Sequence, residues 1–143
     1  MKYNIRKLMK TDFEEYIVLI SQLRPIGIIP TREKFEEIYD TIFTNNIIFI
    51  AEEHLTKKLI GSITLLIEQK FIHNLSKDAR IEDVIVDENY RKQNIGMSLV
   101  KFAIDYAKKA NVFKITLTCK KYLENFYKKN NFEIYDIHMS QLL

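Results

Sequence analysis

Residues Ile81 to Val100 read IEDVIVDENYRKQNIGMSLV and join a strand pattern to a helix pattern through a polar loop. Ile81 to Val86 is a short, mostly apolar run with β-branched residues, which is typical of a strand. Asp87 to Asn94 is polar and rich in turn-forming residues. From Gly96 onward, apolar residues recur at helical spacing and would form one buried face: Leu99, Val100, Phe102, Ala103, Tyr106 and Ala107.

A strand, a polar loop and a helix in this order can bind an anion. The loop can aim successive backbone N–H groups at one point, and the helix dipole adds partial positive charge there. Phosphate is the most natural ligand for such a site. An ordinary helix start that binds nothing is the alternative that these residues leave open.

Length and composition indicate a single globular domain over residues 1–143, with 47% hydrophobic and 12% aromatic residues to supply a core. The apolar runs are too short to cross a bilayer, and the N-terminus lacks an apolar signal region. The one cysteine, Cys119, suits a reducing compartment. We therefore expect a cytoplasmic protein without a membrane span.

Charge and ligand types narrow the function further. The formal net charge of +3 comes from 22 Lys and Arg against 19 Asp and Glu. This mild excess is compatible with a small anionic ligand and too dispersed to indicate nucleic acid. The three histidines are scattered and there is one cysteine, so we expect no metal.

The remaining pattern predicts a mixed α/β fold in the order β-αα-β-β-β-α-β-α-β. Thr11 and Thr31 are predicted helix N-caps, Thr11 in a capping box with Glu14. The predicted strands are 2–8, 47–53, 59–67, 81–86, 112–119 and 132–139. One predicted helix begins after Thr11, and a second runs from Thr31 to about residue 44. Two further helices are predicted over 96–110 and 122–130. An antiparallel hairpin would lead into a β-α-β unit.

The loop from Arg91 to Gly96 resembles the R/Q-x-x-G-x-G/A loop with which GNAT acetyltransferases grip the pyrophosphate of acetyl-CoA. Asn94 stands where that pattern has a glycine, and asparagine is among the residues most tolerant of a positive φ. The element order also resembles the GNAT fold from end to end. In that fold two adjacent strands splay apart around the pantetheine arm, and here they would be 81–86 and 112–119.

A narrower resemblance is to the glucosamine-6-phosphate N-acetyltransferase branch of this family. The segments that carry it are Lys70–His73, Ile81–Val84, Tyr90–Arg91, Lys114–Cys119 and Phe126–Lys129. Departures are present as well: Lys92 and Asn94 replace two loop glycines, Asn131 replaces another, and Leu142 stands where the branch has a basic residue that reaches the sugar phosphate.

The resemblance implies direct transfer of acetyl from acetyl-CoA to the amine of glucosamine 6-phosphate, in a homodimer, for UDP-N-acetylglucosamine synthesis. The backbone N–H groups of Val84, Ile85 and Val86 would bind the pantetheine amides, and Val84 would polarise the thioester oxygen. From the residues alone, this run would simply be a core strand. The pyrophosphate would be held by Arg91, Lys92, Gln93, Asn94, Ile95, Gly96 and Met97.

Glu82, Asp83 and Tyr127 are the catalytic candidates. The two carboxylates are adjacent in an apolar strand and should face opposite sides of the sheet, where they would hold the sugar and accept the proton of the amine. A salt bridge to a nearby cation is the alternative. Tyr127 would protonate the departing sulfur; on spacing alone it could be a packing aromatic.

The acceptor site would draw on two further segments. Lys70, Phe71, Ile72 and His73 would contribute to the sugar-phosphate site, in part across the dimer interface, although a solvated lysine and a packed loop histidine remain possible. Thr118 and Cys119 would line the pocket, with Cys119 not a nucleophile. Arg24 can compensate for the missing basic residue at Leu142.

Two other functions fit the sequence less well. A GNAT enzyme for a polyamine or a protein amine would want an acidic or open groove. A non-catalytic acyl-CoA-binding module would not need Tyr127. All three functions share the fold; the two enzymes differ in the acceptor, and the binding module has none.

Overall fold

The computed structural model describes residues 2–143, and within them five strands form one sheet in the order β1-β2-β3-β4-β5. The strands are β1 (Tyr3–Lys7), β2 (Asn46–Glu53), β3 (Leu59–Gln69), β4 (Lys77–Val86) and β5 (Val112–Leu117). Neighbouring strands are antiparallel except β4 and β5, which are parallel. The predicted mixed α/β fold is confirmed.

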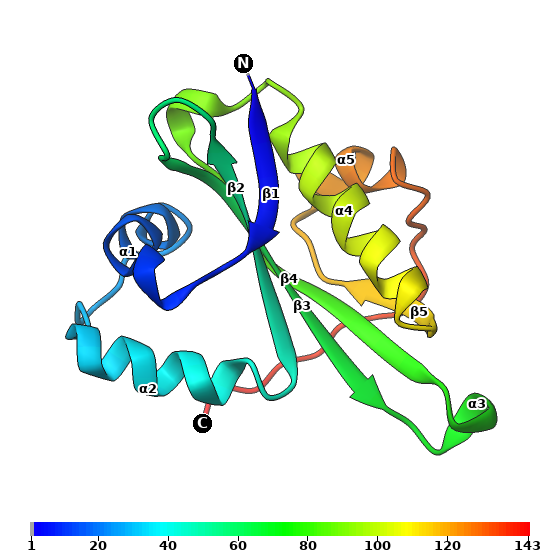
Figure 1. The fold of residues 1–143 in the computed structure, drawn as a ribbon. Coiled ribbons are helices and arrows are strands. Elements are labelled where there is room, and N and C mark those ends of the chain that lie inside the picture. The colour runs from blue at the N-terminus through cyan, green and yellow to red at the C-terminus, as the bar shows by residue number, and fades with distance from the viewer. Residues whose placement is uncertain (1) are drawn as a thin grey trace.

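Helices cover both faces of this sheet. The helices are α1 (Phe13–Ser21), α2 (Arg32–Ile42), α3 (Ile72–Leu75), α4 (Ile95–Lys109) and α5 (Glu124–Lys128), and all except α3, which lies at the tip of the β3–β4 hairpin (Figure 1), pack on the sheet. In Figure 1, α1 and α2 lie on one side of the sheet and α4 and α5 on the other. Within residues 2–143, none of the helices combines the length and apolar character that a membrane span requires.

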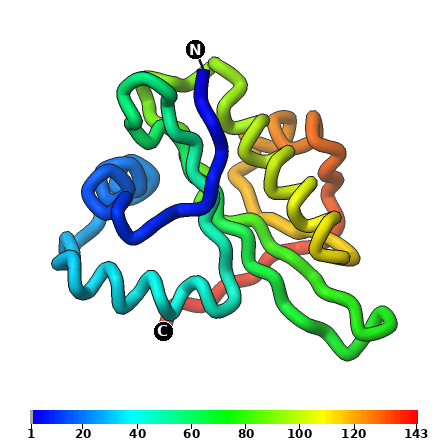
Figure 2. The backbone as a smooth tube through the Cα atoms, in the orientation of Figure 1, coloured from blue at the N-terminus to red at the C-terminus, as the bar shows by residue number. Residues whose placement is uncertain are grey.

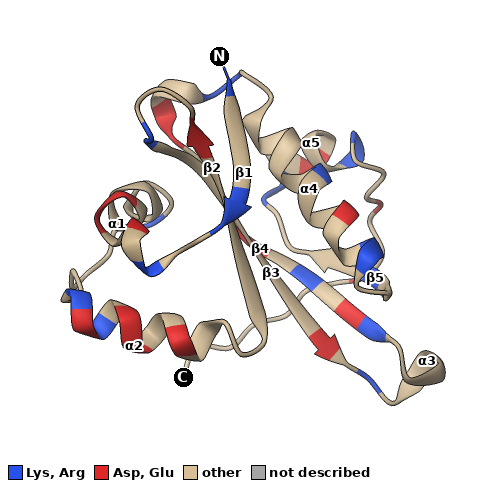
Figure 3. Ribbon diagram, viewed as in Figure 1, with Lys and Arg blue, Asp and Glu red and all other residues tan. Residues whose placement is uncertain are grey.

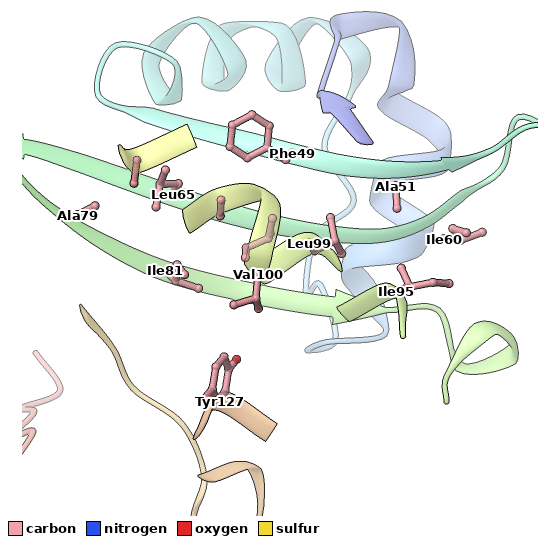
Figure 4. Packing of buried hydrophobic residues seen from close by; sticks show 13 residues of the cluster. Phe49, Ala51, Ile60, Leu65, Ala79, Ile81, Ile95, Leu99, Val100 and Tyr127 are labelled. Atoms are coloured by element: carbon pink, nitrogen blue, oxygen red, sulfur yellow. The ribbon is translucent and has the colours of Figure 1, made fainter. Parts of the chain in front are cut away.

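Two hydrophobic cores result, because strand side chains alternate between the faces. Along β2, Phe49 and Ala51 pack in the α4-side cluster, while Ile48 and Ile50 pack in the cluster under α1 and α2. The α4-side core, drawn in Figure 4, includes Leu99, which is fully buried. This face also carries the C-terminal helix α5, so α4 and α5 pack in the same core.

One of the two predicted helix caps is confirmed. The Thr31 side chain accepts the backbone N–H of Lys34 at 3.2 Å. The Thr11 cap is wrong, because a 3₁₀ turn over Lys10–Asp12 delays α1 until Phe13. Asp12 instead accepts the Met9 backbone N–H at 2.8 Å and pairs with Arg6.

The predicted strand 132–139 is wrong. Its alternating sequence has strand character, but it pairs with no strand among residues 2–143. A strand needs a neighbouring ladder, and sequence pattern alone does not supply one. Residues 133–143, which we call the tail, are exposed throughout and run as an extended trace to the C-terminus (Figure 2).

Candidate active site

The parallel strand β5 pairs with only the first half of β4. Their register runs from Lys77 opposite Val112 to Ile81 opposite Leu117. β4 then continues to Val86 with β3 as its only paired neighbour among the described residues. Backbone groups of this part of β4 that point toward β5 therefore remain available to a ligand. Pairing between the two strands predicted to splay apart therefore stops at Ile81 and Leu117, where β5 ends.

A β-bulge re-aims the side chains where the gap opens. The β3–β4 register shifts between Ser62 and Thr64, and Asp83 has a φ of 49°. Ile81 and Val84 both pack with the α4-side core, whereas strict alternation would put them on opposite faces. The expectation that Glu82 and Asp83 face opposite sides is wrong, because the bulge interrupts the alternation between them.

Both carboxylates lie on the face that carries α1. Glu82 pairs with Arg80, its neighbour two residues earlier on that face, at 2.7 Å between Oε1 and Nε. Burial, with a smaller contribution from the Asp83 charge, raises the pKa of the Tyr16 hydroxyl in α1 to about 12. Both acids are exposed, so they can reach a ligand lying over this face. The salt-bridge alternative applies to Glu82.

The loop between β4 and α4, together with the first two residues of α4, covers residues 87–96 and is called the anion loop here. Lys92 and Asn94 have φ values of 62° and 63°, the left-handed conformation that favours glycine. These are the two positions where the related loop has glycines. Asn131, the third replaced glycine, also has a φ of 62°. The backbone thus adopts a conformation that favours glycine at all three positions, although none of them is a glycine.

The anion loop delivers unpaired N–H groups at the start of α4. The first backbone bond of that helix runs from the Ser98 N–H to the Asn94 carbonyl at 3.0 Å. The N–H groups of Ile95, Gly96 and Met97 precede it and have no partner within the helix. Asn94 does not cap them with its side chain. This arrangement suits an anionic ligand.

Gly96 connects this loop to α5 by close packing. A Cβ at this position would lie 3.2 Å from the Phe126 ring and 3.5 Å from Val86. The absent side chain thus lets α5 approach the start of α4. Phe126 is the neighbour of Tyr127, so the loop and the candidate acid are in contact through one aromatic ring.

Tyr127 is buried at the edge of the α4-side core, with 8% of its surface exposed. Its ring packs against Phe126 and Phe132, and its side chain points from α5 toward β4 (Figure 4). Burial, with a smaller contribution from Cys119, raises the pKa of its hydroxyl above 10. The hydroxyl is therefore protonated at neutral pH and can donate a proton. Cys119 is half-buried, and Thr118 beside it is exposed.

Among the predicted acceptor residues, Cys119 lies near Tyr127, whereas the 70–73 segment and Arg24 do not gather there within this chain. Residues 70–75, which we call the hairpin tip, join β3 to β4, and Phe71 there is 95% exposed. Lys70 pairs with Glu68, and His73 stacks on Phe113 with ring centroids 4.4 Å apart. Arg24 is exposed in the α1–α2 connection.

Sequence reasoning missed the buried carboxylate of Asp87. It begins the anion loop, is 2% exposed, and accepts the Asn89 backbone N–H at 2.9 Å. An aspartate directly after an apolar strand, two residues before a turn asparagine, is an available signal for such an Asx turn. Its more distant partners, Gln22 and Lys58, leave no trace in local sequence.

Charged residues of both signs are interspersed along α2 and along the β3–β4 hairpin (Figure 3). Within residues 2–143, no group of three or more His, Cys, Asp or Glu side chains is placed to hold a metal ion.

Comparisons with known proteins agree with this geometry. The Acetyltransferase (GNAT) family matches residues 5–132. A glucosamine 6-phosphate N-acetyltransferase from Arabidopsis thaliana is 32% identical over 143 residues, covering 97% of this chain and 95% of the relative. A glucosamine 6-phosphate N-acetyltransferase from Dictyostelium discoideum is 32% identical, covering 96% of this chain and 88% of the relative.

Solved structures give the same result. The crystal structure of glucosamine-6-phosphate N-acetyltransferase from Arabidopsis thaliana superposes with a TM-score of 0.93 at 31% identity, covering 99% of both chains. An acetyltransferase structure from Trypanosoma brucei has a TM-score of 0.95 at 22% identity, covering 99% of this chain and 100% of that one. The second match bears on the fold alone.

Proposed function

The chain belongs to the GNAT family of acetyltransferases, and we propose that it transfers acetyl from acetyl-CoA to the amine of D-glucosamine 6-phosphate. The product is N-acetyl-D-glucosamine 6-phosphate, for UDP-N-acetylglucosamine synthesis. The observation that carries the proposal is the gap between β4 and β5, flanked by the anion loop and by Tyr127. Residues 1–143 act as one N-acetyltransferase domain.

The donor would lie along the open edge of β4. The N–H groups at the start of α4, with those of the left-handed positions Lys92 and Asn94, bind its diphosphate. Backbone groups of Val84 to Val86 bind the pantetheine amides, and the Val84 N–H polarises the thioester oxygen. Side chains of Arg91 and Gln93 flank this path.

Transfer is direct, in a ternary complex. The neutral amine attacks the thioester carbon, the C–N bond forms, and the C–S bond breaks to release the CoA thiolate. Tyr127 donates its proton to that sulfur. The amine must lose one proton, and Asp83, with Glu82 holding the sugar, accepts it directly or through water. Holding both reactants in one gap supplies much of the rate.

The acceptor phosphate is assigned to the hairpin tip in a homodimer. Lys70 is its charged ligand, and Phe71, Ile72 and His73 complete the tip, while Thr118 and Cys119 line the sugar side. Support comes from exposed apolar residues, since Phe71 and Ile72 are 95% and 62% exposed in a single chain. Tail residues such as Ile137 are equally exposed, and a second copy would cover them.

Both alternatives remain testable against this proposal. A polyamine or protein acceptor would use the same donor site without a phosphate ligand. A binding module would use it without Tyr127. We assign the protein to the cytoplasm, where its small-molecule substrates are available.

The decisive assay is CoA thiol release from acetyl-CoA with three acceptors: glucosamine 6-phosphate, glucosamine and spermidine. Turnover with the phosphosugar alone is the expected result. Comparable turnover with plain glucosamine would mean that no phosphate site contributes to acceptor binding. Turnover with spermidine alone would overturn the acceptor, and silence with all three despite CoA binding would favour a binding role.

Arg24 has its own test. Its guanidinium is exposed and can reach a phosphate that Leu142 cannot bind. Arg24→Ala is expected to raise the KM for glucosamine 6-phosphate about tenfold, with the KM for acetyl-CoA unchanged. An unchanged KM for the phosphosugar would sink this assignment.

A further inference from the structure

The first residue of the anion loop is a buried carboxylate that the proposed chemistry does not use. Asp87 follows β4 directly and is 2% exposed. Burying a carboxylate costs free energy unless it is paired and hydrogen-bonded. Its partners therefore indicate what the fold holds in place at this position.

Those partners come from three separate segments. The Asp87 Oδ2 accepts from Gln22 Nε2 at 3.2 Å and lies 3.0 Å from Lys58 Nζ. Its Oδ1 accepts from the backbone N–H of Asn89 at 2.9 Å and from the amide of that side chain at 3.3 Å. Gln22 is the C-cap of α1, and Lys58 precedes β3. One carboxylate thus joins α1, the β2–β3 turn and the anion loop.

Gln22 contacts the loop with both ends of its amide. Besides donating to Asp87, its Oε1 accepts the backbone N–H of Glu88 at 3.0 Å. Two hydrogen bonds from one planar group fix orientation as well as position. They act on the 3₁₀ turn Glu88–Tyr90, which leads into the exposed residues of the loop.

Lys58 adds a second contact to the same turn. Its Nζ lies 5.3 Å from the centroid of the Tyr90 ring, close enough for a cation–π interaction. The ammonium, the Asn89 hydrogen bond and the Gln22 amide outweigh the effect of burial and leave the pKa of Asp87 below its ordinary value. The carboxylate is therefore ionised at neutral pH, as this geometry requires.

The part of the loop that would meet a ligand has less support. Lys92, Gln93 and Asn94 are exposed, and two of them are left-handed. Their placement follows from the turn before them. We propose that Asp87, Gln22 and Lys58 are positioning residues, which hold the anion loop in the conformation that binds the diphosphate of CoA. This deepens the proposed function and rests on acetyl-CoA as the donor.

The test uses three variants of the full chain and two acetyl donors. Asp87→Asn removes the charge, Gln22→Leu removes both amide contacts, and Lys58→Met removes the ammonium. Each is expected to raise the Kd of CoA, measured by calorimetry, about tenfold, as the loss of a charge-assisted hydrogen bond predicts. Turnover of acetyl-pantetheine, which lacks the diphosphate, should be unchanged.

Two controls separate positioning from general stability. Asp12→Asn removes a partly buried carboxylate whose partners, Arg6 and Met9, lie outside the anion loop; it should lower the unfolding temperature without changing the Kd of CoA. Lys58→Arg keeps the charge and should restore CoA affinity lost in Lys58→Met.

The outcomes are distinct from those of the acceptor assay. Folded Asp87→Asn and Gln22→Leu proteins with the wild-type Kd of CoA would overturn the inference, and so would equal losses with both donors. Wild-type protein that binds CoA but does not acetylate glucosamine 6-phosphate would overturn the proposed acceptor, while the Kd comparison would still decide the role of these residues.

Discussion

The anion loop and the hairpin tip lie at opposite ends of β4, and they differ in how much support the chain itself provides. The anion loop is anchored by the buried Asp87 and packed through Gly96 against α5. The hairpin tip extends away from both cores, with Phe71 and Leu75 mostly exposed. The loop at the C-terminal end of β4 is thus packed against other parts of the same chain, whereas the tip at its N-terminal end is left largely uncovered.

This difference separates the two substrates. Everything assigned to the donor lies where one chain supplies its own contacts. The residues assigned to the acceptor phosphate lie in the hairpin tip, where apolar side chains are exposed to solvent in a single chain. The tail also exposes apolar side chains. We infer that the donor half is complete in a monomer, whereas the acceptor half needs a second copy. The following experiments separate the two halves.

Removal of the tail should have the largest effect. Deleting residues 133–143 takes away side chains that are exposed in the single chain, so the core should still fold. We expect sedimentation to show a monomer. Acetylation of glucosamine 6-phosphate should fall about 100-fold or more, because the second copy would no longer contribute to the acceptor site. The Kd of CoA should be unchanged.

A point variant at full length provides the control for truncation. Ile137→Asp should also disrupt the dimer, because a charge would enter the covered face. A monomeric truncated protein that retains wild-type turnover would contradict the division into two halves.

Tyr127→Phe tests the group between the halves. The ring keeps its packing against Phe126 while the proton donor is lost, so kcat should fall about 10²- to 10³-fold with little change in either KM. Since burial raises the pKa of Tyr127, deprotonation of its hydroxyl should not reduce kcat near neutral pH. Tyr122→Phe, at an exposed position, is the matched control; equal rates for both variants would remove Tyr127 from the mechanism.

The left-handed position Asn94 tests the donor half alone. Asn94→Val should weaken CoA binding about tenfold, because a β-branched residue at positive φ costs about 1–2 kcal/mol. Asn94→Gly should preserve or tighten binding, which isothermal titration can measure. A large loss with glycine would refute the account of the loop, and acceptor KM should not respond to either change.

The smallest effect should come from Glu53, which belongs to neither half. Hydrogen bonds from Thr56 and Leu55 lower its pKa from 4.5 to about 2. A lowered folded pKa means that its stabilisation is present above pH 4.5 and is lost as the pH falls toward 2. When the urea unfolding midpoint is plotted against pH, the Glu53→Gln variant should show a smaller decrease in this pH range than the wild type, and its Kd of CoA should be unchanged. A pH profile identical to that of the wild type would contradict the assignment.

Local sequence patterns predicted the parts of the fold that depend on local physics. The apolar run Ile81–Val86 and the helical spacing after Gly96 placed the end of the strand, the loop and the helix correctly, although β4 begins at Lys77, four residues before the predicted start. The positive φ of Asn94 was expected from the family resemblance, because Asn94 stands at a glycine position of the loop and asparagine tolerates that region. In each case the cause acts between residues close in the chain, so sequence spacing carries it.

Other features depend on contacts that sequence spacing does not contain. The bulge at Asp83 arises from its register with β3, so alternation misplaced the two carboxylates. The partners of Asp87 lie in α1 and the β2–β3 turn. The segment 132–139 has the alternation of a strand and lacks a ladder within the described chain.

The left-handed positions of this chain also bear on how such sites are found. None of the three glycines, all within residues 2–143, has a positive φ, whereas Lys92, Asn94 and Asn131 do. A phosphate accepts hydrogen bonds from backbone N–H groups. Its binding therefore depends on how these N–H groups are oriented and not on the side chains of the residues that carry them. Signatures that demand glycine letters will therefore overlook equivalent loops in lineages whose coding preferences favour asparagine and lysine, and searches based on backbone torsion will recover them.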